Sequence, residues 1–225
     1  MSNADPYTKK AEQAAEGLTP QQKIDGTLSL KHTSVPVLMS LRTGLKQVLK
    51  STKYCMFTTR SPEGELHARC MAPASTRQPA DVGLAEGLRF SFIANNATFK
   101  MDEIEFDSHV NVSFLDPSST CWVSVAGKAQ ITNDRETIKS LWSPLVAAWF
   151  GDLGDGVHKG DASDPRVSAI QVVPDSIRYW YAQRSSLGQM TEIVTSAMTG
   201  GTAAPGQLRT ITKAEIQLVE GLNTA

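Results

Sequence analysis

The clearest hydrophobic pattern in the chain is the alternation over residues 109–132, HVNVSFLDPSSTCWVSVAGKAQIT. Every second residue from Val110 to Phe114 is apolar, and the alternation resumes after the turn-forming residues 116–119. Period-two alternation on both sides of a Pro-containing turn predicts an antiparallel hairpin. Gly127 interrupts the second strand, which predicts a bulge or a bend at that position.

Shorter patterns of the same kind predict five more strands, two of them separated by Pro174-Asp175. The predicted strands cover residues 53–59, 66–72, 88–94, 166–173 and 176–183. Apolar residues at helical spacing and capping residues predict helices at 9–16, 34–49, 134–142, 144–150 and 212–216, and one that ends near 106. Asn95, Asn96 and Thr98 are the candidate caps of that last helix.

Six or seven antiparallel strands with helices inserted between them favour a mainly β (α+β) fold over a doubly wound sheet. The specific prediction is a Greek-key barrel with peripheral helices. The patterns divide the chain into an N-terminal arm (1–35), a barrel domain (36–187) and a C-terminal tail with a short helix (188–225).

Composition narrows the class of function. The 225 residues are 40% hydrophobic, which supports a real core, and the formal net charge of −1 gives no field that favours nucleic acid or a membrane surface. No apolar run approaches about 18 residues. Three cysteines without metal spacing, and a start without a signal pattern, predict buried reduced thiols in a cytosolic protein.

Common catalytic motifs are absent from the sequence: there is no GxSxG elbow, no HExxH and no Cys/His nucleophile arrangement. The acidic, glycine-rich residues 151–164 superficially suggest calcium, but Asp152 and Asp155 do not fit the carboxylate spacing of an EF-hand loop. We therefore expect a solvated loop there and no metal.

Two places carry candidate binding chemistry. In the second strand, His67 and Arg69 share one face, which fits either a solvent-facing pair or a half-buried arginine that lines a ligand cavity. At the strand-to-helix junction, Thr98 and Lys100 would add a hydroxyl and an ammonium to free backbone N–H groups. That junction fits either a phosphate site or an ordinary capped helix with an exposed lysine.

The run Tyr179-Trp180-Tyr181 is a third candidate. Aromatic residues this dense indicate a core or a dimer interface, although a planar ligand would also stack on them.

Taken in order, several segments resemble the pyridoxamine 5′-phosphate oxidase-like FMN-binding split barrels. Within that family the sequence is similar to the general stress protein 26 branch, which includes the fungal blue-light-inducible Bli-3 proteins. The segments are HARCMA, FIANNATFKMDEIEFDSHVNVSF, DPSSTCWVSVAGKAQITNDR, the LWSP…AWF element and PDSIRYW, and the resemblance covers roughly residues 36 to 187.

The resemblance implies a split barrel with FMN bound at a homodimer interface. It implies that Arg69 lies on the isoalloxazine ring, and that Thr98 and Lys100 contact the phosphate. The full set of implied cofactor-binding residues is Arg69, Cys70, Met71, Ala72, Ile93, Ala94, Thr98, Lys100, Trp122 and Trp180. Three positions depart from the family. Phe99 replaces a second phosphate cation, and Trp122 replaces a glutamine on the flavin. The family's second arginine after the terminal tryptophan has no counterpart, since Arg184 comes too early.

The resemblance implies one of two functions in stress or light response: a flavin-dependent oxidoreductase for an unknown small molecule, or a non-catalytic flavin sensor or reservoir. Pyridoxamine 5′-phosphate oxidase activity is not expected, because Ser140 to Asp164 holds only Lys159 and His158 as cations among four aspartates. In the same segment, Trp142, Trp149 and Phe150 predict an apolar wall.

Overall fold

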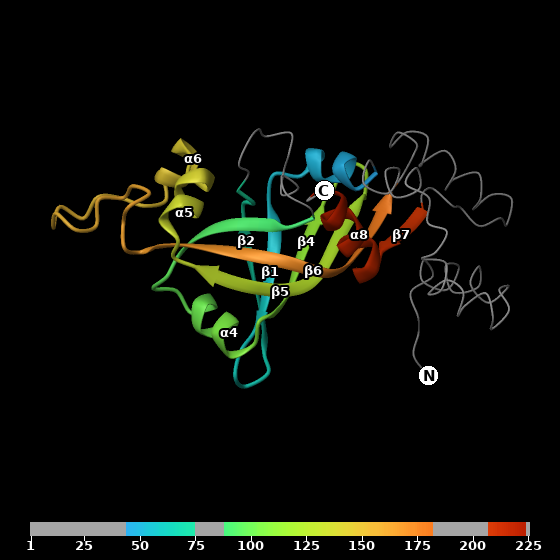
Figure 1. Cartoon of the computed structure of the whole chain (residues 1–225), viewed down its shortest axis with the longest axis horizontal. Helices are drawn as coiled ribbons and strands as arrows, with labels where there is room; N and C mark the ends of the chain where they lie inside the picture. Colours follow the sequence, from blue (N-terminus) through green and yellow to red (C-terminus); the bar gives the residue numbers. More distant parts are fainter. Residues whose placement is uncertain (1–43, 75–87, 182–206, 224–225) are drawn as a thin grey trace, which may run out of the picture.

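The computed structural model describes residues 44–74, 88–181 and 207–223, with side chains to residue 218 in the last range (Figure 1). The predicted arm, most of the loop at 73–87 and the linker at 199–206 lie outside these ranges. The strands are β1 (Cys55–Arg60), β2 (Leu66–Met71), β3 (Phe90–Asn95), β4 (His109–Leu115), β5 (Trp122–Thr132), β6 (Val167–Tyr181) and β7 (Gln207–Ile211). The helices are α4 (Lys100–Phe106), α5 (Arg135–Leu141), α6 (Pro144–Ala147) and α8 (Lys213–Asn223), and residues 44–51 are also helical.

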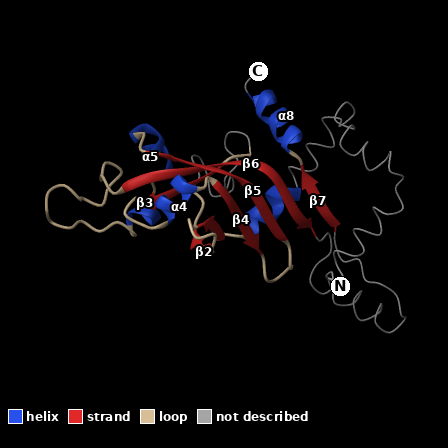
Figure 2. Cartoon of the chain, turned by 90° about the horizontal axis from the view of Figure 1, so that it is seen from below, coloured by secondary structure: helices blue, strands red, loops and turns tan. Residues whose placement is uncertain are grey.

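All strand pairs are antiparallel, and the strand order is β2-β1-β4-β5-β6-β3, with β7 added to β6. Strand β6 pairs with β5 on one side, and on the other side its two halves pair with β3 and β7. The ends of this order meet at one bridge, in which the Ala74 N–H donates to the Ser91 carbonyl at 2.7 Å. The fold is therefore the predicted mainly β split barrel, with helices around the sheet (Figure 2).

The hairpin predicted from the alternating pattern is confirmed as β4 and β5, with Leu115 opposite Trp122. The register between β5 and β6 shifts after Ala126, so that Gly127 lies opposite Pro174. A Cβ at position 127 would be 2.4 Å from the Val173 carbonyl oxygen, so this position needs glycine.

The prediction of two separate strands at 166–173 and 176–183 is wrong, and the same bulge explains why. Pro174 and Asp175 lie inside the continuous strand β6, because the bulge tolerates a residue without an N–H. Strand β7 was not predicted, because five residues with a charge in the middle carry a weak pattern. The helix predicted after Thr212 is confirmed as α8, and Glu215 accepts from the Thr212 N–H at 2.7 Å.

Two hydrophobic cores support the sheet. The main core fills the barrel, and a smaller core lies between α5, β3 and β6. In the smaller core, the Trp142 and Phe150 rings are 5.7 Å apart, whereas Trp149 is 85% exposed. Phe150 is therefore buried in the smaller core with Trp142 packed against it, and Trp149 is exposed; the apolar wall stays a prediction.

The cysteines follow their strand faces. Cys55 and Cys121 are buried as predicted, and burial raises the pKa of Cys55 to about 12. Cys70 is exposed, contrary to the prediction, because it lies on the outer face of β2, at one end of the strand order. None of the helices in the described ranges is long and apolar enough to cross a membrane.

Candidate functional site

Arg69 lies on β2, opposite the buried residue Phe57 of β1. Its side chain is 26% exposed, so it is neither fully buried nor free in solvent. One terminal nitrogen donates to the Thr59 hydroxyl, and the other donates to Glu103 Oε2 at 2.9 Å. Arg69 is therefore half-buried and not solvent-facing, and it is held by side chains of β1 and α4.

Glu103 is the buried centre of this arrangement. Its side chain is 7% exposed, and its carboxylate accepts hydrogen bonds from Thr59, from Arg69 and, at 2.5 Å, from the Nδ1 of His67. Burial alone would raise the pKa of Glu103, but these hydrogen bonds outweigh burial and lower it to about 2. The hydrogen bond to Glu103 in turn raises the pKa of His67.

Lys100 is the first residue of α4 and lies close to Arg69. Its Nζ donates to the Thr98 hydroxyl at 2.6 Å, and that hydroxyl donates to the Asn95 carbonyl at 2.6 Å. Burial lowers the pKa of Lys100, and the positive charge of Arg69 adds to that effect. The N-cap residue of α4 is Phe99, with no side-chain cap, so the predicted caps are wrong: Asn95 and Thr98 bond within the turn before the helix.

We call Thr59, His67, Arg69, Lys100 and Glu103 the α4 corner. Within this set, Arg69 and Lys100 supply two positive charges and Glu103 supplies one negative charge. Protonation of His67 would add a third positive charge, and the exposed carboxylate of Glu65 lies 3.3 Å from its Nε2. The α4 corner therefore has an excess of positive charge and several N–H donors, which is the chemistry that binds a phosphate or another small anion.

The other implied residues divide between the two faces of the sheet. Met71 packs against the main core opposite Cys55, whereas Cys70 points outward. Ala94 is buried in the main core, and Ile93 packs against the smaller core. Ala72, just after β2, is exposed.

Trp122 and Trp180 are direct partners across β5 and β6, and both are partly buried. They lie in one row across four strands, with Leu115 on one side and Leu208 on the other. Their neighbours along the strands, including Val123, point into the core, so the two tryptophans face outward. Arg69 shares the opposite, inward face with Phe57. One copy of the chain therefore does not bring the tryptophans to the α4 corner.

The family model "Pyridoxamine 5'-phosphate oxidase like" matches residues 42–204. The chain belongs to the pyridoxamine 5′-phosphate oxidase-like family. It is 36% identical to protein bli-3 of Neurospora crassa over 186 residues, which span 82% of this chain and 85% of that protein. It is 29% identical to general stress protein 26 of Bacillus subtilis over 96 residues, spanning 41% and 62% of the two chains.

Solved structures of this family support the fold. A structure from Jannaschia sp. CCS1, provisionally named general stress protein 26, has a TM-score of 0.58 at 19% identity and covers 77% of this chain and 99% of its own. A protein from Clostridium acetobutylicum, related to general stress protein 26 of B. subtilis, has a TM-score of 0.51 at 16% identity, with coverage of 80% and 96%.

The sequence reasoning missed Thr59 and Glu103, although signals for both were present. Thr59 is a polar residue at an inward position of β1, in register with buried Cys55 and Phe57. Glu103 lies three residues after Lys100, between the buried residues of α4. A polar side chain at a core position needs a hydrogen-bond partner, and each of these two residues is the partner of the other.

Among the described residues, which include the acidic loop, no group of three or more His, Cys, Asp or Glu side chains is arranged to hold a metal ion. Asp152, Asp155 and Asp161 accept hydrogen bonds from backbone N–H groups of their own loop. The prediction of a solvated loop is wrong at Asp164, because this residue is 1% exposed and pairs with Arg166 at 2.7 Å.

Proposed function

We propose that this member of the family binds FMN and that the α4 corner holds the phosphate. The observation that carries the proposal is that Arg69 of β2, which is bound to the buried Glu103 carboxylate, lies close enough to Lys100 of α4 for the two positive charges to interact. A phosphate would supply the negative charge that these cations lack, and each charge-assisted contact is worth about 1.5–3 kcal/mol. The donor set of the α4 corner therefore fits the phosphate end of this cofactor.

Each residue would have a distinct task. Thr98 fixes the Lys100 ammonium through one hydrogen bond and leaves its other N–H groups for a ligand. Arg69 presents a planar guanidinium suited to two phosphate oxygens. The resemblance to the family implied a ring contact for Arg69, but its position beside Lys100 favours the phosphate end.

We also propose that the functional unit is a homodimer. Trp122 and Trp180 face away from the barrel core, on the face opposite to Arg69, so one copy alone cannot place them and the α4 corner on one flavin. A second copy related by two-fold symmetry could supply the missing part of each site. Light scattering with FMN present should give about twice the 24.3 kDa chain mass, and a monomer at micromolar concentration would contradict the proposal.

When bound, FMN would supply hydride and electron transfer. The activity that we propose is therefore a flavin-dependent oxidoreductase, with a role in stress suggested by the name of general stress protein 26 and a role in light response by the resemblance to the blue-light-inducible Bli-3 proteins. The second candidate is a non-catalytic flavin sensor or reservoir, which Trp122 favours because it stands where the oxidases have a glutamine. Rapid reduction of the loaded protein by NADH or NADPH would distinguish the two.

Pyridoxamine 5′-phosphate oxidase activity remains disfavoured. His158 is bound to Asp155 at 2.5 Å, so it is not free to grip a substrate phosphate. Hydrogen peroxide release from FMN-saturated protein supplied with pyridoxamine 5′-phosphate should stay well below about 1 s⁻¹.

The deciding experiment is a fluorescence and absorbance titration of the purified full chain with FMN and with riboflavin. Saturable binding of FMN that is at least about tenfold tighter than that of riboflavin supports a phosphate site, since one charged contact is worth this much. Equal affinity for both flavins would contradict the proposed phosphate site. Binding of neither flavin would contradict the proposed function.

A further inference from the structure

The Arg69 guanidinium is held from two directions by residues of other elements. Thr59 of β1 accepts from one terminal nitrogen, and Glu103 of α4 accepts from the other at 2.9 Å. The Thr59 hydroxyl also donates to the same Glu103 oxygen that Arg69 contacts, which closes a three-membered network. These bonds use two of the five N–H groups of a guanidinium, so the network fixes the group without using all its donors.

Glu103 is a costly way to fasten α4 to the sheet. A buried carboxylate must be desolvated, and well-packed apolar residues stabilise such a contact equally well or better. Ile104 and Met101 of the same helix already pack in the main core. Stability alone therefore does not explain a carboxylate at this position.

We propose that Glu103 is a positioning residue, which with Thr59 orients Arg69 toward a bound phosphate. The proposal rests on the proposed function, because it takes the phosphate of FMN as the ligand of the α4 corner. An arginine that is already ordered loses less side-chain freedom when it binds, so its contact is stronger. Glu103 therefore strengthens FMN binding although its own charge repels the phosphate.

Two simpler roles of Glu103 predict different changes in flavin affinity when the residue is removed. If Glu103 were only a counter-ion that competes with the ligand for Arg69, its removal would strengthen FMN binding. If it were only a structural tie between α4 and the sheet, its removal would weaken FMN and riboflavin together. Positioning predicts weaker FMN binding and unchanged riboflavin binding.

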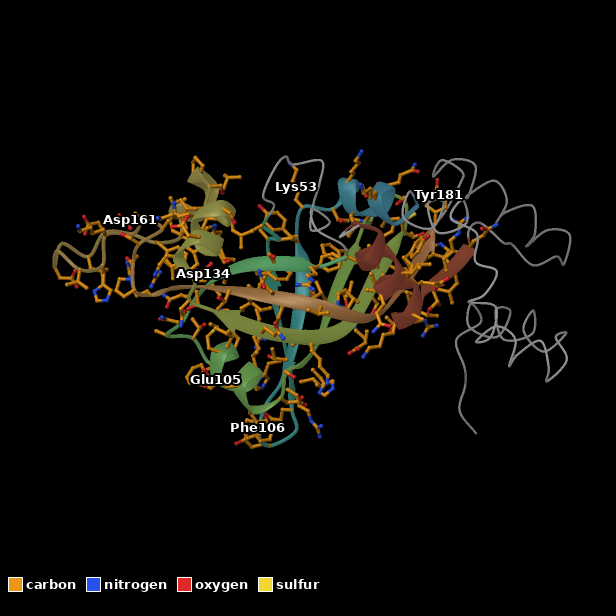
Figure 3. All side chains as sticks on the ribbon, in the orientation of Figure 1. Lys53, Glu105, Phe106, Asp134, Asp161 and Tyr181 are labelled. Atoms are coloured by element: carbon orange, nitrogen blue, oxygen red, sulfur yellow. The ribbon has the colours of Figure 1, made fainter. Side chains whose placement is uncertain are left out.

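The test compares Glu103→Met, which removes both oxygens, with Glu103→Gln, which keeps one acceptor. We expect the Met variant to bind FMN about five- to tenfold more weakly, and the Gln variant to lie between it and the wild type. Riboflavin affinity should stay within about twofold in both variants. The control is Glu105→Gln, because Glu105 is exposed on the same helix (Figure 3) and should change neither affinity.

The same substitution in an Arg69→Ala background makes the test sharper. Without an arginine to orient, only the repulsion between Glu103 and the phosphate remains, so Arg69→Ala/Glu103→Met should bind FMN as tightly as Arg69→Ala or more tightly. A further loss in the double variant, equal to the loss in the wild-type background, would overturn the proposal. Equal losses for FMN and riboflavin in Glu103→Met, or tighter FMN binding, would overturn it as well.

Thr59→Val provides a second variant if the Glu103 variants do not fold. It keeps the shape of the side chain and removes the hydroxyl that holds Arg69, so FMN affinity should fall about threefold and riboflavin affinity should not change. No change in FMN affinity would count against the proposal. If the wild type does not prefer FMN to riboflavin, the proposed phosphate site fails. If it does and the variants behave otherwise than expected, only the positioning role fails.

Discussion

Two buried carboxylate–arginine pairs in this protein have different surroundings. Asp164 and Arg166 lie at the end of the acidic loop, in the part of the molecule marked by Asp161 in Figure 3. Glu103 and Arg69 belong to the α4 corner, and Glu103 lies on the same helix as Glu105, which Figure 3 labels. The carboxylate side chains are 0% and 7% exposed, so both must be paired to be tolerated.

The Asp164 pair is closed on itself. Arg166 donates from Nε to Oδ1 at 3.0 Å and from NH2 to Oδ2 at 2.7 Å, and the backbone N–H groups of Gly160 and Arg166 complete the carboxylate. One positive and one negative charge balance, and every partner of the carboxylate lies within residues 160–166. Such a pair fixes the conformation of a loop.

The Glu103 pair is open. Its partners come from β1 and β2, 34 to 44 positions away in the sequence, and Lys100 adds a second cation beside Arg69. The charge excess distinguishes this pair from the closed one. Asp155 and Asp152 add negative charge around Arg166, whereas Lys100 adds positive charge beside Arg69, so only the Glu103 pair has the charge that the proposed phosphate site needs.

The largest expected effect is the loss of stability when the pair of Asp164 and Arg166 is broken. Asp164→Asn leaves the positive charge of Arg166 without its partner, and breaking a buried pair costs about 3–5 kcal/mol. Urea unfolding should show a loss of this size. The exposed residue Asp161 supplies the control: Asp161→Asn keeps an acceptor for its turn and should cost less than about 0.5 kcal/mol.

Flavin binding provides the second readout of Asp164→Asn. Where the folded protein persists, the ratio of FMN to riboflavin affinity should equal that of the wild type, because the closed pair has no charge to offer a ligand. A changed ratio would mean that the two pairs are coupled, and would contradict the purely structural role of the Asp164 pair.

The next effect is on the acid stability of the α4 corner. The pKa of Glu103 falls from an ordinary 4.5 to about 2 on folding, so the unfolded chain binds more protons in this window. The stability that Glu103 contributes is therefore complete above about pH 4.5 and is lost as the pH falls toward 2. Glu103→Gln should remove this part of the slope, whereas Glu105→Gln should keep it.

Chemical unfolding at several pH values between about 2 and 5 measures the difference between wild type and variant. Asp116 also has a pKa lowered to about 2, by hydrogen bonds from Ser118 and Ser119, so the wild-type slope alone does not isolate Glu103. A constant difference across the window would show that Glu103 does not titrate with folding, and the open pair would then resemble a fixed structural contact.

Local patterns predicted most of the fold because the relevant signals lie close together in the sequence. The β4–β5 hairpin, the Asp134 cap of α5 and the capping box of Thr212 all depend on residues within one element or one turn. Strand β7 and the continuous strand β6 depend on pairing between distant segments, which periodicity does not encode.

The residues of the candidate site also fall into those that the sequence revealed and those that only the folded structure revealed. Residue type and order brought out Arg69 and Lys100, but not that they are neighbours. The hydrogen bonds of Arg69 to Glu103 and Thr59 need α4 to pack on β1, and that packing is a property of the folded chain. The burial of Asp164 was hidden for the opposite reason, because an aspartate in a glycine-rich segment has the composition of a solvated loop.

The last prediction concerns the two cations of the open pair. Lys100→Ala should weaken FMN about ten- to a hundredfold, since a charge-assisted contact is worth about 1.5–3 kcal/mol, and should leave riboflavin unchanged. Arg69→Ala should give the same pattern if Arg69 serves the phosphate. Lys100→Arg keeps the charge and should recover part of the loss, and Lys139→Ala, at an exposed lysine of α5, is the matched control.

Equilibrium titrations with both flavins separate the remaining alternatives. If Arg69→Ala weakens FMN and riboflavin equally while Lys100→Ala weakens FMN alone, Arg69 contacts the ring, as the family resemblance implied, and only Lys100 serves the phosphate. If Lys100→Ala weakens both flavins equally, the phosphate lies elsewhere and the excess charge of the α4 corner does not bind it. Selective loss in both variants requires the two cations to act on the same group, and the electrostatic interaction between Arg69 and Lys100 places them close enough for this.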